Sequence, residues 1–155
     1  MPIAPTLRKF LDQNVAYELI THEPTKSSTQ TAEVCHIPGD WLAKGVVLRH
    51  AGGYMLAVLP ASRHLRLSEL RAQLGNDVRL ATEDEIPQLF QDCDPGAVPV
   101  IGACYALDVI IDESIDDLPE IYMEGGDHVT LVHMGKSEFA RLTAQARHGR
   151  FSARI

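Results

Sequence analysis

Residues 42–61 read LAKGVVLRHAGGYMLAVLPA, and this stretch decides the fold. Two apolar runs, 43–49 and 54–61, flank Ala51-Gly52-Gly53, which is a pattern typical of a β-hairpin. Both faces of each run are largely apolar, so we expect two strands that are buried on both sides.

The segments around this hairpin mix helical and strand patterns. Ser27 with Gln30 and Thr82 with Glu85 are capping-box patterns, and Ser137 is a third candidate helix cap. The expected helices are 6–14, 27–36, 65–74, 82–90 and 137–147, and the expected further strands are 15–21, 78–81, 104–111, 120–123 and 129–134. No repeat or linker interrupts them, so we expect one domain over residues 1–155. Hairpins without strict alternation of strand and helix predict an α+β fold, with a mixed, partly barrel-like β-sheet flanked by helices.

Composition bounds the class of protein. The chain has 155 residues, 45% of them hydrophobic, which suits one packed core and excludes a disordered chain. No apolar run approaches the roughly 18 residues of a membrane span, and the first residues do not look like a secretory signal. Three cysteines do not make a disulfide framework, so we expect reduced thiols and a cytoplasmic location.

The charge is acidic and unevenly distributed. The net charge is −7, from 14 basic and 21 acidic residues. Residues 1–75 hold 8 basic and 6 acidic residues, whereas residues 76–155 hold 6 and 15. Such a chain is a poor candidate for charge-driven nucleic-acid binding without help. A local basic patch in the first half stays open, with Arg63, Arg66 and Arg71 as candidates.

Lys44 is the first candidate functional residue. Alternate residues of a strand share a face, so Lys44 lies with Val46 and Leu48 on an apolar face. Burying a lysine there is costly unless the ammonium group is paired or used. The alternative is that Lys44 lies at the end of the strand and reaches water.

Two glycine-containing segments are further candidates. The loop 94–102 holds two glycines and two prolines, and backbone N–H groups on such a loop can bind an anion or an oxyanion. The turn 124–128 contains Gly125-Gly126, which permits positive φ and close approach of a ligand. Each segment also fits an ordinary tight connection. No zinc-ligand spacing, phosphate loop or nucleophile motif occurs, so we expect neither a metal nor a cofactor.

Five motifs in order resemble the YbaK/EbsC family, also described as the prolyl-tRNA synthetase editing-domain family. They are THEPTKSSTQTAE (21–33), LAKGVVL (42–48), YMLAVLPA (54–61), PGAVPVIG (95–102) and YMEGGD (122–127). The resemblance implies an α+β editing domain that hydrolyses the ester of a mischarged aminoacyl-tRNA, best known for cysteine or alanine on tRNA(Pro). The implied partners are the CCA end of the mischarged tRNA and an aminoacyl-tRNA synthetase.

The resemblance also implies a set of site residues. It assigns Lys44, Gly96 and Gly102 to catalysis, and His22, Ser28, Ala97, Val98, Pro99, Glu124, Gly125 and Gly126 to substrate binding. An aminoacyl ester is already activated, so a placed water and donors for the oxyanion suffice. Lys44 would bind the carbonyl oxygen or the terminal phosphate of the CCA end.

The chain departs from the family pattern at three places. The family loop runs G-x-x-x-P, but here Pro99 precedes Val100. Glu124 stands where relatives often have Ser or Asn, and Asp127-His128 replace basic residues. These changes leave the amino-acid preference open.

An alternative function is a non-catalytic binding or regulatory module of the same fold that recognises an aminoacyl-like ligand or a partner protein. A cysteine-dependent hydrolase is a third possibility.

Overall fold

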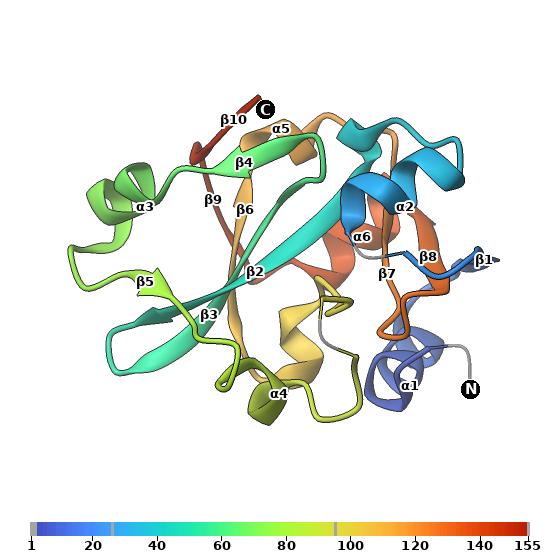
Figure 1. Ribbon diagram of the computed structural model, residues 1–155, viewed down its shortest axis with the longest axis horizontal. Coiled ribbons are helices and arrows are strands. Elements are labelled where there is room, and N and C mark those ends of the chain that lie inside the picture. The colour runs from blue at the N-terminus through green and yellow to red at the C-terminus, as the bar shows by residue number, and fades with distance from the viewer. Residues whose placement is uncertain (1–2, 26, 95, 155) are drawn as a thin grey trace.

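The β2–β3 hairpin lies in the middle of the sheet, as the sequence predicts (Figure 1). The computed structural model describes residues 3–25, 27–94 and 96–154. β2 (Leu42–His50) and β3 (Gly53–Pro60) pair antiparallel along their length. The chain reverses between them because Ala51 and Gly52 both adopt positive φ angles.

The other elements follow in chain order. The strands are β1 (Glu18–Thr21), β4 (Arg63–Leu65), β5 (Arg79–Leu80), β6 (Asp108–Asp112), β7 (Glu120–Glu124), β8 (Thr130–Gly135), β9 (Arg147–Gly149) and β10 (Ser152–Arg154). The α-helices are α1 (Pro5–Asn14), α2 (Ser28–Val34), α3 (Leu67–Leu74), α4 (Ile86–Leu89), α5 (Glu113–Asp116) and α6 (Lys136–Leu142). Two 3-10 helices are η1 (Gly39–Trp41) and η2 (Gly102–Tyr105).

The main sheet is mixed. Its strand order is β1-β8-β7-β2-β3-β6-β9, and β5 adds to β2. The β2–β7, β3–β6 and β6–β9 pairs are parallel, and the other pairs are antiparallel. β4 and β10 form a separate antiparallel ribbon. These findings confirm the predicted α+β class, a mixed sheet flanked by helices. In the described chain β1 and β9, the two ends of the strand order, do not pair with each other, so the sheet remains open.

The sheet divides along the outer edge of β2. Leu42 and Ala43 pair with β7, whereas Leu48 and Arg49 pair with β5. In the described part of the chain, no strand pairs with this edge at residues 44–47. The edge of β2 at residues 44–47 is therefore left open between β7 on one side and β5 on the other.

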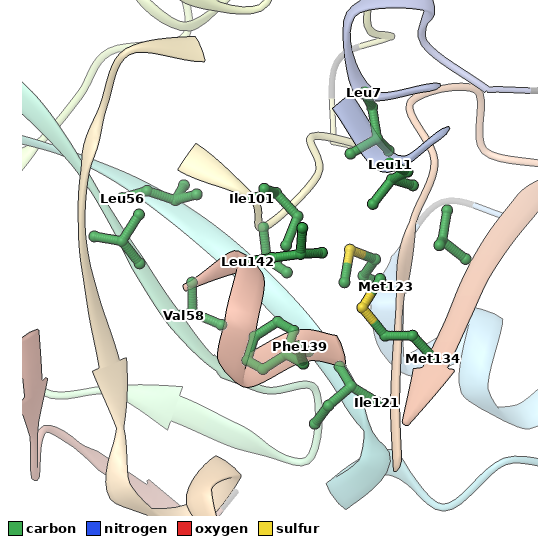
Figure 2. Close-up of a cluster of buried hydrophobic side chains, with 14 of the residues drawn as sticks. Leu7, Leu11, Leu56, Val58, Ile101, Ile121, Met123, Met134, Phe139 and Leu142 are labelled. Atoms are coloured by element: carbon green, nitrogen blue, oxygen red, sulfur yellow. The ribbon is translucent and has the colours of Figure 1, made fainter. Parts of the chain in front are cut away.

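The largest core cluster fills one face of the sheet. Leu7 and Leu11 of α1, together with Phe139 of α6, pack against side chains from β7 and β8 (Figure 2). Leu7 and Leu11 repeat at helical spacing and are fully buried, which fixes α1 against the sheet. This cluster covers one face of the sheet, and α2 and α3 pack on the opposite face.

The opposite face carries two smaller clusters. One places Ala32 of α2 against Leu42 of β2 and Leu131 of β8. The other places Leu70 of α3 against Leu48 of β2. Lys44 lies between Leu42 and Leu48 on β2, and therefore between the two apolar clusters.

Several boundaries differ from the sequence prediction. The strand expected at 104–111 begins at Asp108, because η2 and a left-handed Ala106 (φ 57°) precede it. The last helix was expected over 137–147 with Ser137 as its cap, but α6 begins at Lys136, follows Gly135 without a side-chain cap and ends at Leu142. Residues 143–146 form a turn, and β9 begins at Arg147 with a signal too short to recognise. Among the described residues, no helix is long and apolar enough to cross a membrane.

Candidate functional site

A cleft of about 230 Å³ opens where the sheet divides. Residues 44–47 of β2 form its floor, Leu80, Ala81 and Ile86 form one wall, and Gly96, Val98 and Glu124 complete it. Ala81 closes this wall by donating its N–H to Val47 O at 2.9 Å. Lys44, the loop at Gly96 and Glu124 thus converge on one hollow, although about 80 residues of sequence separate the first from the last.

Lys44 brings an uncompensated positive charge to this cleft. The side chain is partly buried, and burial lowers the pKa of its ammonium group. No carboxylate of the described residues lies within ion-pair distance of it. An ammonium group held partly out of water without a partner is costly, so a ligand oxygen is its natural partner.

Glu124 ends β7 on the same face of the sheet. Leu42 pairs with Tyr122, and continuing that parallel register places Lys44 beside Glu124. The Glu124 side chain is only 4% exposed. Its Oε1 accepts a hydrogen bond of 3.2 Å from the Thr31 hydroxyl of α2. Its Oε2 is buried and has no hydrogen-bond partner in the described part of the chain.

Burial raises the pKa of Glu124, because removing a carboxylate from water disfavours its charged form. The hydrogen bond from Thr31 and the charges of His22 and His128 act in the opposite direction. Asp127 adds to the rise. The site therefore holds a carboxyl group whose charged form is disfavoured by burial and favoured by neighbouring donors and positive charge.

His22 lies directly after β1, where its backbone N–H donates to Val129 O at 2.7 Å. The ring Nδ1 lies 2.7 Å from the carbonyl oxygen of Glu23, so Nδ1 carries the hydrogen of this bond. Nε2 is buried and has no hydrogen-bond partner among the residues described. His22 thus presents a second unsatisfied polar atom close enough to act on Glu124 electrostatically.

The loop after α4 supplies Gly96 and Val98 to the cleft. Gly96 has φ +81°, and a Cβ at this position would lie 3.3 Å from the His128 ring. Ala97 and Pro99 are buried and anchor the loop. The Ala97 N–H donates to Asp94 O at 3.1 Å, so this donor is already used within the loop.

Three of the predicted glycines do not line the cleft. Gly102 begins η2, and a Cβ there would come 2.5 Å from Val109, so packing demands this glycine. Gly125 would likewise clash with Ile3 at 2.6 Å, and Gly126 (φ +107°) packs against Ala4. Their roles in the described structure are to permit close packing and a tight turn.

The Gly125-Gly126 turn nevertheless positions the site indirectly. Gly125 O accepts from Ala4 N–H at 2.8 Å, and Gly126 O accepts from Asp94 N–H at 2.7 Å. The second bond ties the turn that follows Glu124 to the loop that carries Gly96. Gly126 thus links two walls of the cleft through its backbone carbonyl.

Ser28 begins α2, but its side chain lies outside the described part of the structure. The neighbouring Ser27 caps this helix by accepting from Gln30 N–H at 3.2 Å, as the capping-box pattern predicts. Sequence reasoning missed Thr31, which holds Glu124, and Gly45, Leu80 and Ile86, which shape the cleft. The signal for Thr31 was its position one helical turn after the capping serine.

The three cysteines are free thiols. Burial raises the pKa of Cys93 and Cys104 to about 12, and it also raises that of Cys35. A nucleophilic cysteine needs the opposite shift. Among the described residues, no group of three or more His, Cys, Asp or Glu side chains is arranged to hold a metal ion.

Comparisons with known proteins place this geometry in context. A candidate trans-editing enzyme for prolyl-tRNA synthetase has the same fold, with a TM-score of 0.85, 21% identity, and coverage of 99% of this chain and 98% of that one. A hypothetical protein matches with a TM-score of 0.83 at 18% identity, over 96% of this chain and 99% of its own.

A third similar structure is a candidate signal transduction protein from Marinobacter aquaeolei VT8. It has a TM-score of 0.75 and 20% identity, and the match covers 96% of this chain but 30% of that longer one. No curated protein matches the sequence. The family model described as the aminoacyl-tRNA editing domain matches residues 22–142, a span that contains Lys44, the Gly96 loop and Glu124. The chain therefore belongs to the aminoacyl-tRNA editing domain family.

Proposed function

We propose that this protein is a trans-acting aminoacyl-tRNA deacylase that hydrolyses the ester of a mischarged tRNA. The observation that carries the proposal is the unpaired, partly buried Lys44 in a cleft shared with the Gly96 loop and Glu124. Membership of the editing-domain family supports the same activity. The similar structure described as a candidate trans-editing enzyme for prolyl-tRNA synthetase makes cysteinyl- or alanyl-tRNA(Pro) the first substrates to test.

Hydrolysis of an aminoacyl ester needs a bound carbonyl, a water and stabilisation of the oxyanion that develops when water attacks. Lys44 supplies a point charge for the carbonyl oxygen or for the terminal phosphate. The N–H groups of Gly96 and Val98 are the candidate oxyanion donors, because that of Ala97 is used within the loop. When the tetrahedral intermediate collapses, the ester C–O bond breaks and the ribose oxygen leaves as the hydroxyl of the tRNA.

The wall of the cleft limits which amino acid enters. Ile86, Val98 and Ala81 are apolar and border a small volume, which suits a short side chain. A single methylene changes binding by about 1–3 kcal/mol, so the proposed preference is graded rather than absolute. We expect the protein to act in the cytoplasm, where charged tRNA is found, and to associate with a synthetase that supplies the tRNA.

The test is deacylation of a panel of charged tRNAs, including Ala-tRNA(Pro) and Cys-tRNA(Pro), by the purified protein. Lys44→Ala should lower the rate by about 100-fold, the usual effect of removing one electrostatic contact to the transition state. Lys9→Ala removes an exposed lysine of α1 and should leave the rate unchanged. Absence of deacylation throughout the panel, or a Lys44→Ala rate equal to that of the unmodified protein, would contradict the proposal. Tight binding of an aminoacyl-like ligand without turnover would instead favour the non-catalytic module.

A further inference from the structure

Two buried polar atoms beside the cleft lack partners. Glu124 Oε2 and His22 Nε2 are both buried, and neither makes a hydrogen bond within the described residues. Protein interiors rarely leave such atoms unsatisfied, and exceptions often mark a place where another group binds. Glu124 is 96% buried and lines the cleft, so its unpartnered oxygen lies in the wall of the cleft, where a small rotation of the side chain would bring it to a group that enters.

The surroundings define what that group is. A carboxylate oxygen accepts hydrogen bonds, so the group must donate them, and a cation donates most strongly. Lys44 lines the same cleft without forming an ion pair with Glu124, and its ammonium group repels a second cation near itself. The cleft therefore has a cationic end at Lys44 and an anionic end at Glu124, with the apolar Val98 and Ile86 nearby. An aminoacyl ester has the complementary arrangement, with an ammonium group one carbon away from an electron-rich carbonyl.

We propose that Glu124 binds the α-ammonium group of the aminoacyl substrate, so that the cleft selects esters with a free amine and rejects N-acylated ones. This inference rests on the proposed deacylase function and specifies its substrate class. Thr31 donates a hydrogen bond to Oε1, which leaves Oε2 for the ammonium group, and His22, directly after β1, acts on the carboxylate electrostatically. A bound ammonium group keeps the carboxylate ionised despite its burial, and this counteracts the rise that burial causes in the pKa of Glu124.

An N-acyl group removes the positive charge of the amine and all but one of its N–H donors, which are the two features that Glu124 would recognise. The amine becomes a neutral amide with one N–H, and the added acyl group has to fit a cleft of about 230 Å³. Peptidyl-tRNA and N-formylated initiator tRNA are N-acylated, so a free-amine requirement would protect them from hydrolysis.

The experiment compares Ala-tRNA(Pro) with N-acetyl-Ala-tRNA(Pro), and the same pair for cysteine. We expect the unmodified protein to favour the free amine by at least about tenfold in kcat/KM, the discrimination that one unpaired buried polar group gives. Glu124→Gln should lower kcat/KM for the free-amine substrate by about tenfold or more and thereby remove most of its advantage over the N-acetyl substrate. Because glutamine matches glutamate in shape and still accepts from Thr31, the variant should fold normally. Glu120→Gln, on the same strand and the same face, should preserve the preference.

A binding measurement keeps this inference separate from the proposed function. Titration of the protein with alaninamide and with N-acetylalaninamide, followed by NMR, should show saturable shifts at Thr31 and His22 for alaninamide alone, and Glu124→Gln should abolish them. Equal hydrolysis of both tRNAs would overturn the amine site and leave the deacylase standing. Alaninamide binding without turnover of any tRNA would support the amine site and contradict the deacylase. Neither binding nor turnover would overturn both.

Discussion

Lys44 carries a charge that the fold does not neutralise, and this has a cost in stability. Burial lowers the pKa of its ammonium group, so the folded state binds the proton less tightly than the unfolded chain does. Below both pKa values, the charged form destabilises the folded protein. As pH rises through the interval between the lower folded pKa and the unfolded pKa, the unfolded state holds more protons and stability rises.

Lys44→Met should therefore raise the free energy of unfolding at neutral pH by about 0.5–2 kcal/mol while lowering the rate of deacylation by about 100-fold. Chemical denaturation at several pH values measures this directly, and the rise in stability at alkaline pH should disappear in the variant. Lys9→Met, at an exposed position of α1, provides the matched control and should change neither property. A Lys44→Met protein less stable than the parent would show that the ammonium group is compensated in the folded state.

The predicted site residues differ in where the structure places them, for separable reasons. Lys44 stands out because a charged residue interrupts an apolar strand face, which is a local pattern. The resemblance assigns Gly102 to catalysis and Gly125 to substrate binding, but neither lines the cleft, and a Cβ at either position would clash with Val109 or Ile3. Thr31, which donates a hydrogen bond to Glu124, is 93 residues away in the sequence, and no local pattern predicts that contact.

At the scale of elements, the loop at Gly96 and the β2–β3 turn offer a direct comparison. Gly96 and Gly52 have similar positive φ angles, +81° and +76°. A Cβ at Gly52 would meet nothing within 4 Å, whereas one at Gly96 would approach His128 at 3.3 Å. The two positions thus share a backbone conformation that would strain an L-residue, but they differ in the atoms that surround them.

Alanine at either position should cost about 1–2 kcal/mol of stability, because an L-residue is strained in the left-handed region. Gly96→Ala should also lower kcat/KM for deacylation, since the loop lines the cleft. Gly52→Ala should leave kcat/KM unaltered. Thermal unfolding and steady-state kinetics on both variants provide the check, and equal activities would show that the loop backbone takes no part in the reaction.

Element types were easier to predict than element ends. The β2–β3 hairpin and the Ser27 cap followed from local patterns, and both are present. The start of β6 was placed too early because Cys104 and Tyr105 look strand-like, but η2 takes those residues. The end of α6 was placed too late because β9 pairs with β6, a long-range contact that overrides helical propensity.

At the scale of the whole molecule, the net charge of −7 limits how tRNA can be held. Lys44 is the cationic side chain among the described residues that line the cleft. Arg63, Arg66 and Arg71, expected to help, do not line it. Arg63 and Arg71 are hydrogen-bonded to Ser152 and to Val78 O. Arg79 is paired with Glu85. The fold thus offers the CCA end few phosphate contacts.

Weak electrostatic attraction has a measurable signature in salt dependence. Each phosphate contact to a single strand contributes about −0.7 to the slope of log affinity against log salt concentration. With one or two contacts, log kcat/KM should fall with a slope of about −1 between 50 and 200 mM KCl, a range chosen because screening changes strongly across it. Loss of Lys44 should flatten this slope if its ammonium group contacts the phosphate, and leave it unchanged if the group contacts the carbonyl oxygen. A slope steeper than about −4 would require a basic tRNA-binding surface that the arrangement of charges in this fold does not provide.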